Sequence, residues 1–147
     1  MGSLMVVNAL TLSVTDNGDF LQLRNTTNSL ALIHEIRVSQ TSTTTLAMNV
    51  IRITRGSGGA AGTALTEREY DTAGQTPVVA AFSLPTTDVG SADFIYAGGW
   101  NVLQEWVYLP PPEHRIPLKS SQHLSVSLLN SATFTIHCQA VWEEIGA

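Results

Sequence analysis

The stretch HLSVSLLNSATFTIHCQAVW, residues His123–Trp142, carries the clearest structural pattern in this chain. Apolar side chains alternate with polar ones on both sides of the polar pair Asn130-Ser131. A period of two is typical of a β-strand that buries one face. The stretch therefore predicts two strands joined by a short turn, with Ser125 and Ser127 among the outward residues. The inward positions are Leu124, Val126, Leu128, Phe134, Ile136, Cys138, Ala140 and Trp142.

Similar alternation continues toward the N-terminus and predicts further short strands. Between the first two of them lies Asp16-Asn17-Gly18-Asp19, and an Asn-Gly pair is the strongest short signal for a β-hairpin. We therefore expect residues 1–25 to form an N-terminal arm that ends in a hairpin. Gly98-Gly99 is expected to end the sixth strand listed below, residues 94–97. The expected strands, in chain order, cover residues 10–14, 20–25, 30–40, 47–55, 78–84, 94–97 and 100–109.

Residues 56–76 differ from the rest of the chain, because glycine and other small residues dominate there. A charged patch, Glu67-Arg68-Glu69, interrupts this segment. Long loops inside compact domains are usually functional or disordered. We expect a projecting loop, with a short strand near residues 65–70.

The pattern as a whole favours an all-β protein, because no segment shows apolar residues at helical spacing. About eight to ten short strands, separated by turn signals, are typical of an antiparallel β-sandwich. Among sandwiches, a jelly-roll-like arrangement fits long loops between strands best. We expect one such domain over residues 1–147, which is long enough to bury a core without disulfides or a structural metal.

The composition excludes several classes of protein. Only 13% of the residues are charged, about half of the usual share, and the net charge is −5. Nucleic acids and anionic membranes need clustered Lys and Arg, so neither is expected as a partner. A single Cys cannot form an internal disulfide. Residues 1–9 lack the basic start and long apolar centre of a secretory signal, so we expect synthesis in the cytosol.

Residue types that could carry chemistry are present, but their spacing is not that of a known site. The four histidines, His34, His114, His123 and His137, match no metal-binding pattern, so no metal or other cofactor is expected. Cys138 lies on an inward strand face, where a cysteine behaves as a small apolar residue.

Two carboxylate pairs, Glu67/Glu69 and Glu143/Glu144, leave a small hydrolase open as a hypothesis, with a histidine or a glutamate as the acid or base. The favoured interpretation is that these are exposed charges on a loop and near the C-terminus, because catalysis needs convergent groups. We therefore expect no enzyme.

The most distinctive stretch is Gly99–Ile116, GWNVLQEWVYLPPPEHRI. It combines Trp-Asn, a second aromatic cluster, a proline run and Glu-x-Arg, and a polar turn and final hairpin follow. Together with Ile33–Arg55, it resembles small virion proteins of tailed phages over most of residues 30–142. This resemblance implies a head decoration, or cement, protein: a β-sandwich bound to the outside of the capsid, often as a trimer.

The resemblance implies the major capsid protein as partner, a homo-oligomer with a trimer favoured, and a place in the virion after synthesis in the host cytoplasm. It implies no catalytic residues. A core position and an interface position are equally open for Trp100 and Trp106, since large aromatics are common in both. The alternative function is a tail or head-fibre module that binds a carbohydrate receptor, with one of these rings stacked on the sugar. The candidate interface residues are Trp100, Trp106, Tyr108, Pro111, Glu113 and Arg115.

Overall fold

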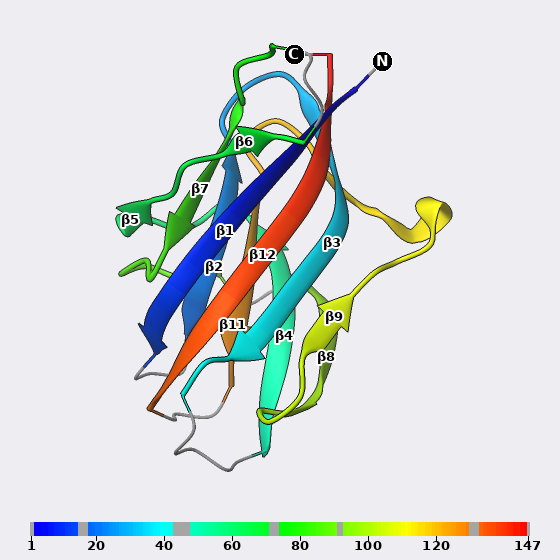
Figure 1. Ribbon diagram of the computed structural model, residues 1–147. Coiled ribbons are helices and arrows are strands. Elements are labelled where there is room, and N and C mark those ends of the chain that lie inside the picture. The colour runs from blue at the N-terminus through cyan, green and yellow to red at the C-terminus, as the bar shows by residue number, and fades with distance from the viewer. Residues whose placement is uncertain are drawn as a thin grey trace.

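The computed structural model describes residues 2–14, 18–42, 48–70, 74–90, 93–129 and 133–146, without the side chains of Asp93 and Phe134. Two antiparallel sheets pack face to face around one apolar core, as Figure 1 shows. The prediction of an all-β sandwich is confirmed. The expected turns at Asp16-Asn17 and Asn130-Ser131 lie outside the described residues.

Sheet A has the strand order β10-β3-β12-β1-β6, and β9 pairs with β3 beside β10. Sheet B has the order β5-β7-β2-β11-β4-β8. Sheet A consists of β1 (Ser3–Val14), β3 (Leu30–Gln40), β6 (Arg68–Glu69), β9 (Trp106–Tyr108), β10 (Ile116–Leu118) and β12 (Phe134–Ile145). Sheet B consists of β2 (Asp19–Asn25), β4 (Met48–Gly56), β5 (Thr63–Ala64), β7 (Val79–Ser83), β8 (Asp93–Asn101) and β11 (His123–Leu128).

The strand pairing follows the jelly-roll pattern. The first half of the chain pairs with the second half in reverse order: β1 with β12, β2 with β11, β3 with β9 and β10, and β4 with β8. From β1 to β4 the strands alternate between the two sheets, and so do β8, the β9 and β10 strands taken together, β11 and β12. The arrangement is therefore one long antiparallel pair of strands rolled into two layers, which is the double Greek key of a jelly roll.

The predicted hairpin within residues 1–25 is wrong. β1 pairs with β12 and β6 in sheet A, whereas β2 pairs with β11 and β7 in sheet B. β1 is also no arm, because Met5, Val7 and Ala9 are buried in the core. β1 and β2 therefore belong to different sheets, and the Asn-Gly signal does not specify which strands pair.

The segment 56–76 does not project from the sandwich as one loop. β5 pairs with β7 at the edge of sheet B, and β6 pairs with β1 at the edge of sheet A. The Gly58 N–H donates to the Val89 carbonyl at 3.1 Å, and a Cβ on Gly58 would lie 2.6 Å from that oxygen. The glycine at position 58 thus allows a close backbone approach, which sequence composition alone cannot separate from flexibility.

Two loops cover the outer face of sheet B. Residues 57–62 and 85–90 meet at an Ala60–Thr87 bridge, and the Gln22 side-chain amide donates to the Thr87 carbonyl at 2.8 Å. Ser125 and Ser127, predicted to face outward, are on that face but are buried beneath this cover. The expectation that these residues are exposed is therefore wrong, although the predicted strand and its faces are correct.

The predicted strands over 94–97 and 100–109 are also placed differently. β8 continues through Gly98 and Gly99, because Gly99 pairs with Val50 and the Tyr96 ring covers Gly98. A turn then follows, in which the Gln104 N–H donates to the Asn101 carbonyl at 2.9 Å. This turn takes the chain from sheet B into β9 of sheet A. The aromatic run is therefore two strands in different sheets.

Candidate binding groove

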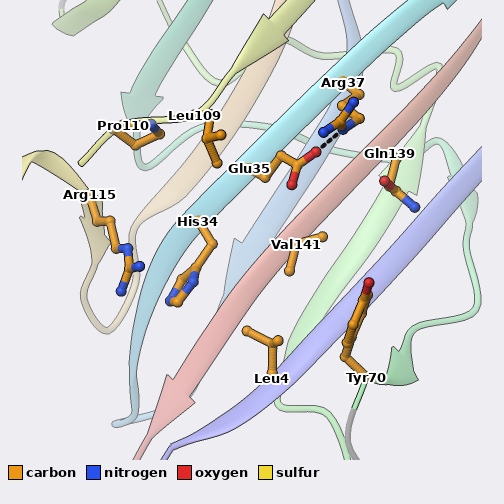
Figure 2. Close-up of a pocket in the computed structure, with 10 residues that line it drawn as sticks. All are labelled: Leu4, His34, Glu35, Arg37, Tyr70, Leu109, Pro110, Arg115, Gln139 and Val141. Carbon is orange, nitrogen blue, oxygen red and sulfur yellow. Dashed lines mark hydrogen bonds and ion pairs between the residues drawn. The ribbon is translucent and has the colours of Figure 1, made fainter. Parts of the chain in front are cut away.

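A groove of about 370 Å³ lies on the outer face of sheet A. Its floor is formed by side chains of three neighbouring strands: Leu4 on β1, His34 on β3 and Val141 on β12, with further polar groups beside them (Figure 2). The full lining consists of Leu4, His34, Glu35, Arg37, Tyr70, Leu109, Pro110, Arg115, Gln139 and Val141.

The two sides of the groove come from connections rather than from strands. Tyr70 follows β6, and its N–H donates to the Leu4 carbonyl at 2.7 Å. On the other side stand Leu109, Pro110 and Arg115, in the connection from β9 to β10 that includes the 3-10 turn η1 (Pro112–His114). Tyr70 and Leu109 are each 65% exposed, so the groove presents apolar groups to solvent.

The charged groups of the groove differ in how they are compensated. Arg37 pairs with Glu35 through Nε and with Glu105 through Nη1, the latter at 2.9 Å. His34 Nε2 lies 3.2 Å from the Glu143 carboxylate. Arg115 Nε, by contrast, is shielded from solvent and has no hydrogen-bond partner among the described residues.

Trp100 and Trp106 are core residues in the structure, with 2% and 8% of their surfaces exposed. The indole N–H of Trp100 donates to the Gln104 carbonyl at 2.8 Å, which secures the turn after β8. Trp106 packs against Tyr96 and Tyr108, with ring centroids 5.6 and 6.3 Å away. The core alternative therefore describes both tryptophans.

The other predicted interface residues lie along the β9–β10 connection. Tyr108 is partly buried beside Trp106, and this burial raises the pKa of its phenol. Pro111 and Glu113 are exposed at η1, and Arg115 lines the groove. Of the six predicted interface residues, only Arg115 lines the groove, and Tyr70 on the opposite side is not among the six. Tyr70 follows the charged patch in a segment interpreted as a loop, and no local pattern places it opposite Arg115.

A second pocket, of about 250 Å³, lies on the sheet B side of the molecule. Asp19 and Asp88 hold it together: the Asp19 N–H donates to Asp88 Oδ1 at 3.0 Å, and the Val89 N–H donates to Asp19 Oδ2 at 2.9 Å. Burial, together with the nearby Asp88 charge, raises the pKa of Asp19, although hydrogen bonds from Gln22 and Val89 oppose the shift. The lining residues are Asp19, Arg52, Thr54, Asp88, Gly90, Phe94 and Ser127.

Three of the four carboxylates considered for hydrolysis bind backbone groups, and the fourth, that of Glu143, faces His34. Glu67 accepts a hydrogen bond from the Ala81 N–H, and Glu69 accepts one from the Gly74 N–H. Glu144 is 1% exposed and accepts bonds from the Val78 and Val79 N–H groups. The expectation of an exposed charge is therefore wrong for Glu144, because its carboxylate is satisfied inside the fold.

The histidines are dispersed in the structure. His123 Nδ1 lies 2.6 Å from the Gly58 carbonyl oxygen, whereas His114 is exposed on η1. Within the described ranges, no three His, Cys, Asp or Glu side chains form a group able to hold a metal ion. Cys138 is buried as predicted, and burial raises the pKa of its thiol.

Comparisons with protein-family models, curated proteins and solved structures found no match to this chain. In the part of the chain that the structure describes, no helix has the length and apolar character needed to span a bilayer.

Proposed function

We propose that this chain is a structural protein of a tailed-phage virion, which binds the outer surface of the head and stabilises it. The jelly-roll pairing of β1–β4 with β8–β12 is the observation that carries the proposal, because this architecture recurs in viral capsid domains. Made in the host cytoplasm, the protein would join the virion as a homo-oligomer, with a trimer favoured, and bind the major capsid protein.

The surface chemistry supports a role in which neighbouring subunits cover much of the protein. With 13% charged residues, much of the surface consists of neutral hydroxyl and amide groups, which cost less to bury than ions. The groove adds an exposed aromatic and an exposed aliphatic side chain, Tyr70 and Leu109, next to polar groups. Anchors of this kind beside polar residues are typical of protein interfaces.

The test is sedimentation with heads of the encoding phage that were assembled without this protein. We expect the purified chain to pellet with them in a fixed ratio and to raise the temperature at which they open, because a ligand of the assembled state stabilises that state. Failure of the wild-type chain to pellet with heads would overturn the proposal.

Variants of the groove identify the binding face. The double change Tyr70→Ser and Leu109→Ser should weaken head binding, because it removes the two exposed apolar groups of the groove. Leu103→Ser is the matched control, since Leu103 is 59% exposed and lies in the turn after β8, outside the groove lining. Equal loss in both variants would place the contact elsewhere.

The second pocket favours a second candidate, a carbohydrate-binding module of a tail or head fibre. Phe94 is 52% exposed and lies beside Arg52, Asp19 and Asp88, which can hydrogen-bond sugar hydroxyls. Jelly rolls also serve as lectins. Trp100 and Trp106 are buried, so Phe94 takes their place as the stacking ring. A glycan array should then give a binder that Phe94→Ala abolishes and Leu103→Ala retains; an array without binders would count against this function.

A further inference from the structure

We propose that the groove on sheet A receives an extended segment of the partner protein, and that a carboxylate side chain of this segment, flanked by apolar residues, pairs with Arg115. The identity of the partner as a capsid protein rests on the function proposed above. The chemistry of the segment is argued from the groove itself.

The charge balance of the groove points to an incoming acid. Two of its three basic residues already face carboxylates: Arg37 pairs with Glu35 and Glu105, and His34 with Glu143. Arg115 Nε is shielded from solvent without a hydrogen-bond partner among the described residues. A shielded guanidinium N–H without an acceptor is costly. The side chain also lacks a carboxylate partner among the described residues, and guanidinium binds a carboxylate through two parallel N–H···O bonds.

Arg115 is held in place before any partner arrives. Its backbone N–H donates to the Pro112 carbonyl at the end of η1. The next residue, Ile116, is buried in the core and pairs with Ile33 of β3. The backbone that carries the Arg115 side chain is therefore fixed, so that binding needs to order the side chain alone.

The remaining groups around Arg115 select a peptide over a nucleic acid. Leu4, Tyr70, Leu109 and Pro110 add apolar surface to the polar lining, whereas a phosphate backbone needs several cations. Figure 2 shows the floor running along β3, β12 and β1, with Tyr70 on one side and Leu109 and Pro110 on the other. A trough along the strands fits an extended chain better than a compact ligand.

The test is to sort a yeast-displayed library of random octapeptides against the full-length chain. We expect enriched sequences with Asp or Glu at one position and apolar residues beside it. Replacing that acid by its amide should weaken binding at least tenfold. The Arg115→Gln variant should select no such sequences. The Arg115→Lys variant keeps the positive charge but not the paired guanidinium N–H groups, so it should select acidic sequences that bind more weakly. Lys119→Gln is the control, because it removes one charge at an exposed turn outside the groove.

Enrichment without an acidic position, unchanged selection by Arg115→Gln, or no enrichment at all would overturn the proposal. So would selected peptides that copy segments of this chain, because a second copy would then occupy the groove. Head sedimentation separates this inference from the function above. Heads that bind wild type and Arg115→Gln equally would overturn the groove inference alone, whereas acidic peptides without head binding would overturn the virion function alone.

Discussion

The Glu144 carboxylate is buried at the end of β12, where it accepts hydrogen bonds from the N–H groups of Val78 and Val79 and from the indole Nε1 of Trp142. Val79 begins β7 of sheet B, so this one side chain connects the two sheets. Because three donors point at one carboxylate, its loss leaves several buried N–H groups without a full partner.

We expect Glu144→Gln to lower the free energy of unfolding by about 1–3 kcal/mol, because the new amide loses the charge and turns an NH2 toward N–H donors. Glu143→Gln is the matched control. Its carboxylate is partly exposed and faces His34, so its removal should cost about 1 kcal/mol or less. Urea unfolding of the two variants and the wild type measures both effects, and equal losses would contradict the connecting role of Glu144.

Asp19 makes stability depend on pH in a defined direction. Burial raises its pKa above the ordinary value of 3.8, so the folded state binds the proton more tightly than the unfolded state does. The folded protein therefore loses stability as the pH rises from about 4 through the raised pKa, and the cost is absent below the unfolded pKa. Asp19→Asn removes this titration.

The stability of Asp19→Asn relative to wild type should accordingly increase as the pH rises from about 4 through the raised pKa of Asp19. Asp88→Asn removes the neighbouring negative charge that helps to raise the pKa of Asp19. This variant should therefore lose less stability than wild type as the pH rises. Unfolding free energies at a series of pH values measure both. A constant difference between Asp19→Asn and wild type across that range would show that Asp19 does not titrate as argued.

Residue patterns predict which face a side chain occupies better than what covers that face. Ser125 and Ser127 lie on the outer face as their alternation indicates, yet loops from two distant parts of the chain bury them. Trp100 could be either core or interface by sequence, because aromatic rings suit both environments. Its burial follows from a turn that the local sequence does not reveal.

Among the described edge strands, β8 is the longest. Within the described residues it pairs with β4 alone, and the chain carries no charge from Phe94 to Gln104. Phe94 and Ile95 are exposed on this strand. Long uncharged edges recruit other strands unless something covers them. The homo-oligomer proposed for the virion role can cover this edge.

A lysine at Ile95 should therefore reduce self-association, because a charge at an edge opposes strand pairing. Leu103→Lys provides the control at an exposed apolar position in the following turn. Sedimentation velocity over a range of concentrations should show an oligomer for wild type and Leu103→Lys, and a shift toward monomer for Ile95→Lys. A wild-type chain that stays monomeric at every concentration would exclude pairing at this edge.

At the level of the whole molecule, alternation predicts strands but not their sheets. Leu30–Gln40 and His123–Leu128 are strands as expected, because a period of two reports one buried face. Local alternation favours a hairpin between β1 and β2, whereas the jelly roll places these two strands in opposite sheets. Likewise the groove unites Leu4, Tyr70, Arg115 and Val141, which are too far apart in the chain for local spacing to connect.

The pairing of β1 with β12 permits a direct test of the roll. Ser3 lies opposite Glu144, so a short linker from residue 147 to residue 1 would join the two strands as a hairpin. A permuted chain opened between β1 and β2 should fold, with an unfolding free energy within about 2 kcal/mol of wild type, because only loop closure changes.

A chain that lacks residues 1–14 should not fold, since Met5, Val7 and Ala9 leave the core. If residues 1–25 were instead a dispensable arm, the chain that lacks residues 1–14 would fold as well as the permuted chain does. Circular dichroism with urea titration of both chains distinguishes these outcomes.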